Sequence, residues 1–134
     1  MGCVKTIFKG GMLFETVLDK HRILVDGPEE WGGQDQGPTP PQLFMTSISS
    51  CVGVLVTHFC NDHHLDTEGL SIDVEYDVAS HPTRFNNIRV KVSLPNAECG
   101  DECTKKALEH VAKHCPVHET IVTLEQIQFE ITTK

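Results

Sequence analysis

The sequence predicts an α+β fold in which short antiparallel strands accompany two principal helices. The prediction rests on short apolar runs between turn residues at the start of the chain, a long uncharged helical pattern, and two alternating segments followed by a second helical pattern. The chain has 134 residues, a length typical of one domain with its own hydrophobic core. We therefore expect a single domain over residues 1–134.

The first apolar runs predict an antiparallel meander. They cover Val4 to Phe8, Met12 to Leu18 and Arg22 to Val25. Gly10-Gly11 and Asp19-Lys20-His21 separate them, and residues of these types favour turns. The next stretch, residues 26–40, is rich in Gly and Pro. We expect a loop there without a regular element.

The middle of the chain predicts a long helix that is buried on nearly all sides. From Gln36 to Asn61 there is no Asp, Glu, Lys or Arg, and Pro40 and Pro41 suit a first helical turn. Apolar residues then recur at helical steps: Phe44, Ile48, Cys51, Val52, Leu55 and Phe59. The other faces carry Ser and Thr and are too polar for a membrane span, so we expect no stretch of the chain to cross a bilayer.

The second half of the chain predicts a hairpin, a second helix and a final strand. Residues 70–78 and 88–94 alternate between apolar and polar side chains, as half-exposed strands do. Residues 101–115 show helical spacing, which ends there because Pro116 disfavours helical backbone at the residue before it. We expect a short helical turn over Pro116 to Ile121 and a last strand from Ile127 to Ile131.

Charge and cysteine content narrow the function. The net charge of −8, from 19 acidic and 11 basic residues, repels phosphate backbones, so we expect no nucleic-acid partner. The first residues lack the apolar core and cleavage site of a secretory signal, and we expect a cytoplasmic protein. Six cysteines in such a protein indicate reactive, metal-binding or buried thiols rather than a framework of disulfides.

Cys51 and Cys115 are the most informative residues. Taken alone, Cys51 is typical of a small buried hydrophobe, because nothing adjacent in the sequence would stabilise its thiolate. Cys115 also faces inward, at a helix break where the backbone can move. Two inward cysteines from the two helices can meet, and a sulfenic acid on one condenses readily with a thiol on the other. With His118, Cys51 would instead suit a Cys-His hydrolase, although no third orienting residue is evident.

Two further clusters have the residue types of a metal site. Cys99 and Cys103 have a permitted zinc spacing, but no second pair lies nearby. His114, Cys115 and His118 surround the helix break and would suit a soft metal. Histidines at helix ends are more often solvated or partners of the helix dipole, and we expect neither a metal nor a cofactor.

Two segments of the sequence resemble the signatures of the OsmC/Ohr superfamily. The first is Gly37-Pro38-Thr39-Pro40-Pro41-Gln42-Leu43-Phe44-Met45-Thr46-Ser47-Ile48-Ser49-Ser50-Cys51, and the second is Cys115-Pro116-Val117-His118-Glu119-Thr120-Ile121. The separation of 64 residues between the two cysteines also matches. Leu65, Gly69-Leu70 and the Glu75-Tyr76 strand occur between them in the order of the family, so the resemblance covers nearly the whole chain.

The resemblance implies an OsmC-like α+β fold in which antiparallel sheets from two chains wrap around two central helices in an intertwined homodimer. It also implies a thiol-dependent peroxidase that reduces organic hydroperoxides, with hydrogen peroxide as a further candidate substrate. In that scheme Cys51 attacks the peroxide, Cys115 resolves the sulfenic acid as a disulfide, and an external dithiol reduces the pair again. The alternative is a non-catalytic OsmC-like module that senses oxidation or binds a small ligand.

The sequence departs from the peroxidase branches of this superfamily near the attacking cysteine. Those branches hold the thiolate with an Arg from the N-terminal strands and a Glu at the start of the central helix. Here Pro41 or Gln42 occupies the Glu position, and Gly10-Gly11-Met12 stands where the Arg is expected. Arg22 is the nearest remaining candidate. We take Gln42, Arg22 and His118 as candidate supporting residues.

Overall fold

The computed structural model describes residues 2–134, except for the side chain of Cys103, and has the predicted α+β fold with antiparallel strands. The chain divides into two compact units, residues 1–46 and residues 47–134. The boundary falls inside the long helix α1, Pro40–Asp62. Each unit is described by itself below, and the single-domain organisation stays a prediction.

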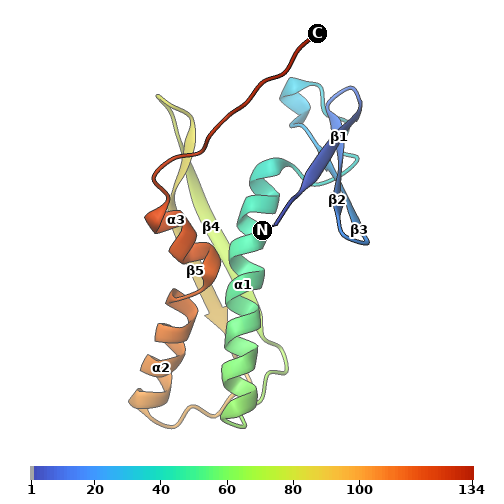
Figure 1. Cartoon of the computed structure of the whole chain (residues 1–134). Helices are drawn as coiled ribbons and strands as arrows, with labels where there is room; N and C mark the ends of the chain where they lie inside the picture. The colour runs from blue at the N-terminus through green and yellow to red at the C-terminus, as the bar shows by residue number, and fades with distance from the viewer. Residues whose placement is uncertain (1) are drawn as a thin grey trace. The chain divides into compact units, whose positions relative to one another are not determined.

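The first unit contains the predicted meander. Strands β1 (Lys5–Gly10), β2 (Leu13–Leu18) and β3 (His21–Asp26) form an antiparallel sheet in the order β1-β2-β3 (Figure 1). The aromatic rings of Phe8 and Phe14 face each other across β1 and β2, with centroids 5.6 Å apart. Cross-strand aromatic contacts of this kind help to fix the register of a sheet.

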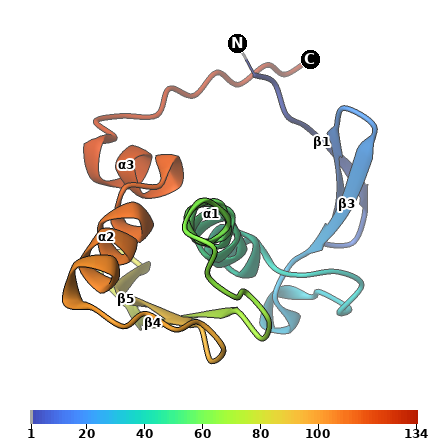
Figure 2. The ribbon, with the colours of Figure 1, turned by 90° about the horizontal axis from the view of Figure 1, so that it is seen from below.

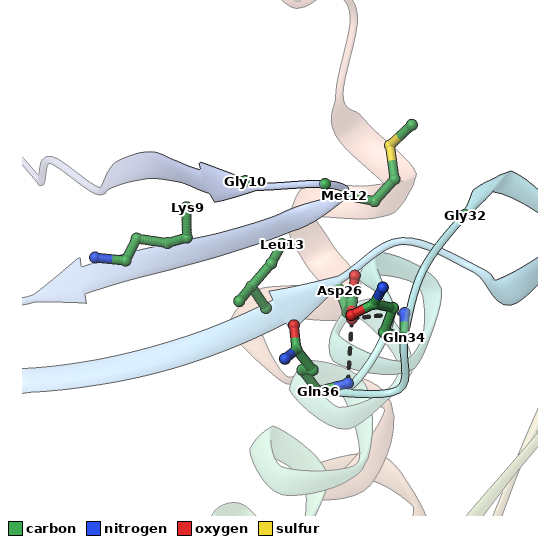
Figure 3. A pocket seen from close by; sticks show the side chains of 9 residues that line it. Lys9, Gly10, Met12, Leu13, Asp26, Gly32, Gln34 and Gln36 are labelled. Atoms are coloured by element: carbon green, nitrogen blue, oxygen red, sulfur yellow. Dashed lines mark hydrogen bonds between the residues drawn. The ribbon is translucent and has the colours of Figure 1, made fainter.

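A buried carboxylate, Asp26, organises the loop that follows β3. Its Oδ1 accepts a hydrogen bond from the backbone N–H of Gly27 at 2.9 Å. Its Oδ2 accepts from the N–H groups of Gln34 at 3.0 Å and Gln36 at 3.1 Å (Figure 3). These hydrogen bonds favour the ionised form and hold the pKa of Asp26 below its usual value. The loop is therefore anchored to the sheet through one side chain.

The loop is more ordered than the sequence predicted. Residues Glu29–Trp31 form a single 3₁₀ turn, η1, in the stretch where no regular element was expected. Gly33 lies so close to the carbonyl of Gly27 that a side chain would collide with it. Gly37 is equally restricted, since an added Cβ would stand 2.5 Å from the carbonyl oxygen of Leu24. The absence of side chains at these two positions allows the loop to fold back on the sheet.

Helix α1 is the predicted long helix and begins at the predicted prolines, but its burial differs from the prediction. Its buried residues form one stripe: Met45, Ile48, Val52, Val56, Phe59 and Cys60. Val54 is 69% exposed and Phe44 is 40% exposed, so the expectation of burial on nearly all sides is wrong for this chain by itself. Small and apolar residues on every face of α1 led to the prediction of burial on nearly all sides. Within this chain the other elements do not cover all of these faces.

The apolar character of α1 also affects the expectation about membranes. An 18-residue window of this helix has a mean hydropathy of 1.7, and 33% of the window is buried. By length and composition alone α1 could therefore cross a bilayer, and the prediction that no stretch could do so is too strong. The core helix of a soluble protein meets the same criterion, so this is weak evidence for a membrane span.

The second unit contains the predicted hairpin and helices. Strands β4 (Ser71–Ala79) and β5 (Arg84–Ser93) pair antiparallel, and helices α2 (Glu102–Lys113) and α3 (Pro116–Thr123) follow. A register shift between Glu75 and Asp77 interrupts the pairing and leaves Val78 exposed. Helix α2 and the hairpin lie beside α1 (Figure 2). Leu108 and Ala112 of α2 and Ile72 of β4 pack against the buried cluster that includes Val52, Val56 and Cys60 of α1.

The predicted final strand is absent from this structure. Residues 124–134 carry no regular secondary structure, and the three alternating side chains of the segment, Ile127, Phe129 and Ile131, are between 64% and 87% exposed. A strand requires a hydrogen-bonded neighbour. Within residues 2–134 no strand pairs with this segment, so its alternating pattern is present without the partner that would make it a strand.

The lowered pKa of Asp26 makes a prediction about stability and pH. Because the pKa is lower in the folded chain than its ordinary value of 3.8, the stabilisation is present above pH 3.8 and is lost as the pH falls through the folded value. Asp26→Asn removes the charge and places an NH₂ group among N–H donors. We expect the wild type to have a higher urea midpoint than this variant at pH 7, and the difference to shrink below pH 3.8. Equal differences at pH 7 and pH 3 would contradict this role.

Candidate functional site

The structure brings Cys51 and Cys115 together in the second unit. Cys51 lies on α1 and is half-buried, whereas Cys115 lies between α2 and α3 and is 0% exposed. The two side chains interact with each other, and both are free thiols. The pair therefore consists of one partly exposed cysteine and one buried cysteine.

The local sequence explains how Cys115 reaches this position. Helix α2 ends at Lys113 and Pro116 begins α3, so Cys115 takes an extended conformation (φ −75°, ψ 145°) as the N-cap of α3. Its Sγ accepts a hydrogen bond from the backbone N–H of His118 at 3.2 Å. Its carbonyl oxygen accepts from the N–H of Glu119 at 2.9 Å. Cys115 is thus the N-cap of α3 as well as one member of the thiol pair.

Apolar side chains surround the pair. Val52, Val56, Cys60 and Cys115 form a buried cluster in which none is more than 3% exposed. Partly buried side chains pack around it, including those of Leu55, Leu65, Leu108, Ala112 and Val117. This environment disfavours a charge on Cys115, since a buried thiolate loses its hydration.

The protonation of Cys115 follows from this burial. Burial raises the pKa of the Cys115 thiol, and its hydrogen bond with Cys51 and the charge of Cys51 raise it further. The backbone N–H groups of His118 and Val117 oppose this by favouring the thiolate. At neutral pH Cys115 is therefore a protonated thiol, which can donate a hydrogen bond to the sulfur of Cys51.

The candidate supporting residues have other partners. Arg22 belongs to the first unit, where its guanidinium pairs with the carboxylate of Glu15 across β2 and β3. The side-chain oxygen of Gln42 accepts a hydrogen bond from the N–H of Thr39 at 2.9 Å, which caps the start of α1. Each of these side chains therefore has a structural partner of its own.

His118 reaches the cysteine pair through its backbone. Its N–H bonds to Cys115, while its side chain lines an apolar groove of about 760 Å³ in the second unit. No carboxylate in the described part of the chain is hydrogen-bonded to the imidazole of His118, so the orienting group that a Cys-His hydrolase needs is not found there.

The groove is bounded by four elements of the second unit. Its walls come from α1, β5, α2 and α3, and they are mostly aliphatic: Ile48, Val52, Val56, Ile88, Val90, Val92, Leu94, Leu108, Ala112, Ile121 and Val122. Lys105, Glu109, Lys113 and His118 add the polar groups. Its volume is in the range of pockets that bind small molecules. Because Val52 and Val56 belong both to the groove and to the cluster around Cys115, the two features share side chains.

The metal alternatives find no support in the geometry. Among residues 2–134, leaving aside the side chain of Cys103, no three potential ligands are grouped to hold a metal ion. The Nδ1 atom of His114 instead pairs with Oε1 of Glu119 at 2.9 Å. The zinc spacing of Cys99 and Cys103 remains a prediction, because the second side chain lies outside the described part.

Cys60 is a buried thiol with a role in packing. It is 0% exposed, burial raises the pKa of its thiol, and the charge of Cys99 contributes in the same direction. A buried cysteine of this kind behaves as a small hydrophobe and reacts slowly.

Sequence reasoning missed the contribution of α3. It expected a short helical turn from Pro116, but not that the N–H groups of this helix would point at Cys115. Pro at the first helical position is a recognised start signal, and it was legible at Pro116.

Comparisons with known proteins agree with this fold. Residues 33–132 match the family described as OsmC-like protein. A protein of osmotic stress induction and detoxification response from Psychrobacter arcticus has a similar structure, with a TM-score of 0.78, 22% identity, and coverage of 90% of this chain and 88% of that one. No curated protein matches the sequence.

Two other solved structures show the same fold. An OsmC-like protein from Mycoplasma pneumoniae has a TM-score of 0.69 and 16% identity, covering 92% of this chain and 89% of that one. A Legionella pneumophila protein has a TM-score of 0.66 and 20% identity, covering 92% and 90%. It is described as the organic hydroperoxide resistance protein OsmC, a predicted redox protein and regulator of sulfide bond formation.

The unequal exposure of the thiols predicts unequal alkylation. With iodoacetamide at pH 8 we expect Cys51 to react at least about tenfold faster than Cys115, because Cys115 is buried and its pKa is raised. Peptide mass spectrometry over a time course measures both rates in one sample. Exposed Cys3 serves as the fast reference and buried Cys60 as the slow one. Equal rates at Cys51 and Cys115 would contradict the asymmetry.

Proposed function

Given that the chain belongs to the family of OsmC-like proteins, we propose that it is a thiol-dependent peroxidase that reduces organic hydroperoxides through Cys51 and Cys115. Family membership supports a redox-related role, and the peroxidase activity is the more specific step that we infer. The supporting observation is the interaction between a partly exposed cysteine and a buried one.

The proposed reaction has three steps. The Cys51 thiolate attacks an oxygen of the hydroperoxide, the O–O bond breaks, and Cys51 becomes a sulfenic acid. The departing alkoxide takes up a proton and leaves as the alcohol. The sulfur of Cys115 then attacks that of Cys51, forming a disulfide and releasing water. An external dithiol reduces the disulfide by exchange and is itself oxidised. Hydrogen peroxide would follow the same course with water in place of the alcohol.

Exposure supports the assignment of the two roles. A peroxide must reach the attacking sulfur, and Cys51 is the member of the pair that solvent contacts. Cys115 needs only to reach Cys51, which it already touches. The protonated Cys115 would also stabilise the Cys51 thiolate as a hydrogen-bond donor. We propose that this donor takes over part of the task that Arg and Glu perform in the peroxidase branches.

A cytoplasmic location would suit this chemistry. Dithiols are kept reduced in the cytosol, so the disulfide of the pair would be returned to thiols there. We propose the same location for the chain, with an external dithiol as its reducing partner.

Hydroperoxide treatment tests the proposal. We expect stoichiometric cumene hydroperoxide at neutral pH to convert both thiols to one Cys51–Cys115 disulfide, detected by peptide mass spectrometry. The rate should exceed that of a free thiol. Cys51→Ser should lower turnover by about a thousandfold or more, because the attacking sulfur is gone.

The second cysteine gives the matched control. In Cys115→Ser the first step is retained and the second is lost, so Cys51 should accumulate as sulfenic and then sulfinic acid. Replacing Cys3, which is exposed and outside the pair, should leave the reaction unchanged. Finding both thiols intact after treatment of the wild type would refute the proposal.

The groove supports a second candidate function. A volume of about 760 Å³ with aliphatic walls would suit a small apolar ligand, in which case the cysteines would sense oxidation without turnover. The two functions differ in a measurable way. A small apolar molecule that stays with the protein through purification, together with a reaction of Cys51 no faster than a free thiol, would favour the binding module.

We also propose that the chain acts as a homodimer. The alternating side chains of Ile127, Phe129 and Ile131 are exposed, and so is Phe8 at 61% in the edge strand β1. Exposed apolar strand edges are the parts of a protein that pair most readily with another chain. A second copy would supply the strand partner that the segment lacks, in agreement with the intertwined dimer that the family resemblance implies.

Light scattering after size-exclusion chromatography tests the dimer. We expect twice the mass of one chain for the wild type, and dissociation on dilution for Phe129→Asp, because a charge would be placed in the apolar contact. Glu130→Ala changes the neighbouring residue on the other side of the segment and should leave the mass unchanged. A folded wild type that is monomeric at every concentration would count against the dimer.

A further inference from the structure

Cys115 takes part in two interactions at the same time. Its thiol interacts with that of Cys51, and its sulfur accepts a hydrogen bond from the N–H of His118. The first contact belongs to the thiol pair. The second belongs to the first turn of α3, where unbonded N–H groups need acceptors for the helix to be stable.

Once the pair is oxidised, the two contacts require different positions of the Cys115 sulfur. A covalent bond brings two sulfur atoms closer than a hydrogen bond does. Forming the disulfide therefore draws the Cys115 sulfur toward α1 and away from His118. Sulfur is also only a weak acceptor. Oxidation of the pair thus weakens the cap of α3.

Helix α3 is held by few buried contacts among the described residues, with Val117 packing against the buried cluster. It has eight residues, none of which is buried. Isolated helices of this length are marginal, so the loss of one capping interaction is a large fraction of what orders it. At its start the carbonyl oxygen of Cys115 accepts the N–H of Glu119 at 2.9 Å, and the side chains of His114 and Glu119 pair on the surface. Surface pairs of this kind contribute little.

The wall of the groove depends on the same helix. His118, Ile121 and Val122 line the groove from α3, opposite the aliphatic residues of β5 and α1. Loosening α3 changes this wall, whereas the walls from β5 and α1 keep their own support. The redox state of the cysteine pair is in this way connected to the shape of a cavity lined by apolar side chains.

We propose that Cys115 is a redox-sensitive cap. In the reduced chain its sulfur holds the start of α3, and formation of the disulfide with Cys51 releases α3 and alters the apolar groove. The inference rests on the disulfide of the proposed function but not on peroxidase activity. The oxidation can be written with any two-electron acceptor: the two thiols lose two electrons and two protons as the S–S bond forms. With diamide as the oxidant, the azo group accepts the two electrons and the two protons and becomes the corresponding hydrazine.

Hydrogen–deuterium exchange of the α3 amides tests the cap directly. Diamide serves as the oxidant, and the Cys51–Cys115 disulfide is verified by mass spectrometry. We expect residues 116–123 of the oxidised wild type to exchange about three- to tenfold faster than those of the reduced protein. Binding of 1-anilinonaphthalene-8-sulfonate, an amphipathic fluorescent anion, should change with the same dependence on oxidation.

Three variants separate capping from disulfide formation. Cys115→Ser keeps a capping oxygen, so α3 should stay protected with and without diamide. Cys115→Ala removes the acceptor, and its α3 should exchange severalfold faster even when reduced. Cys51→Ser keeps the cap but cannot form the disulfide, so diamide should not change exchange in α3. Circular dichroism checks that each variant is folded.

The outcomes distinguish this proposal from the peroxidase. If the verified disulfide leaves α3 exchange unchanged, or if reduced Cys115→Ala matches the wild type, the redox-sensitive cap is wrong and the peroxidase is unaffected. If diamide forms no disulfide between the two cysteines, the cap is wrong as well. If diamide forms it and releases α3 but hydroperoxides react no faster than with a free thiol, the cap stands and the peroxidase fails.

Discussion

The interaction between the Cys51 and Cys115 thiols is the one on which the site in the second unit depends. It exists because Pro116 ends one helix and starts another at the residue after Cys115, which turns the sulfur toward α1. Val52 and Val56 then cover it and exclude water. The helix break, the buried cluster and the start of α3 are therefore parts of one arrangement, and a change in any of them would move the sulfur.

The same arrangement divides the chemistry between the two sulfurs. Both are free thiols in one cluster, so the difference between them comes from access to water and from the groups that contact each. Burial keeps a proton on Cys115, while Cys51 is partly exposed. A chain that lacks the Glu and Arg of the peroxidase branches at the expected positions thus still has a hydrogen-bond donor beside its accessible thiol. How well a neutral donor replaces a cation determines how fast the proposed reaction would be.

The sequence predicted most elements of this fold because their patterns are local. The meander, α1, the β4–β5 hairpin and α2 have periodicities that their own residues determine, and each begins and ends close to the expected residue apart from the start of β5. The strand at Ile127–Ile131 was wrong because pairing depends on a partner that no local pattern contains. At the site, the signatures located Cys51 and Cys115, but the roles of Arg22 and Gln42 could not be inferred from spacing. Their bonds to Glu15 and Thr39 depend on strand register and on the geometry of the helix start.

The burial of Cys115 also affects the order of the proposed steps. To attack a sulfenic acid on Cys51, Cys115 must first lose a proton that its surroundings help it to keep. The N–H groups of His118 and Val117 favour the thiolate and lower this cost, so α3 assists the resolving step as long as it is capped. Once the disulfide forms, that assistance is no longer needed and the cap is weakened. Helix α3 favours the thiolate of Cys115 in the reduced chain. In the disulfide form the same helix has less support at its start.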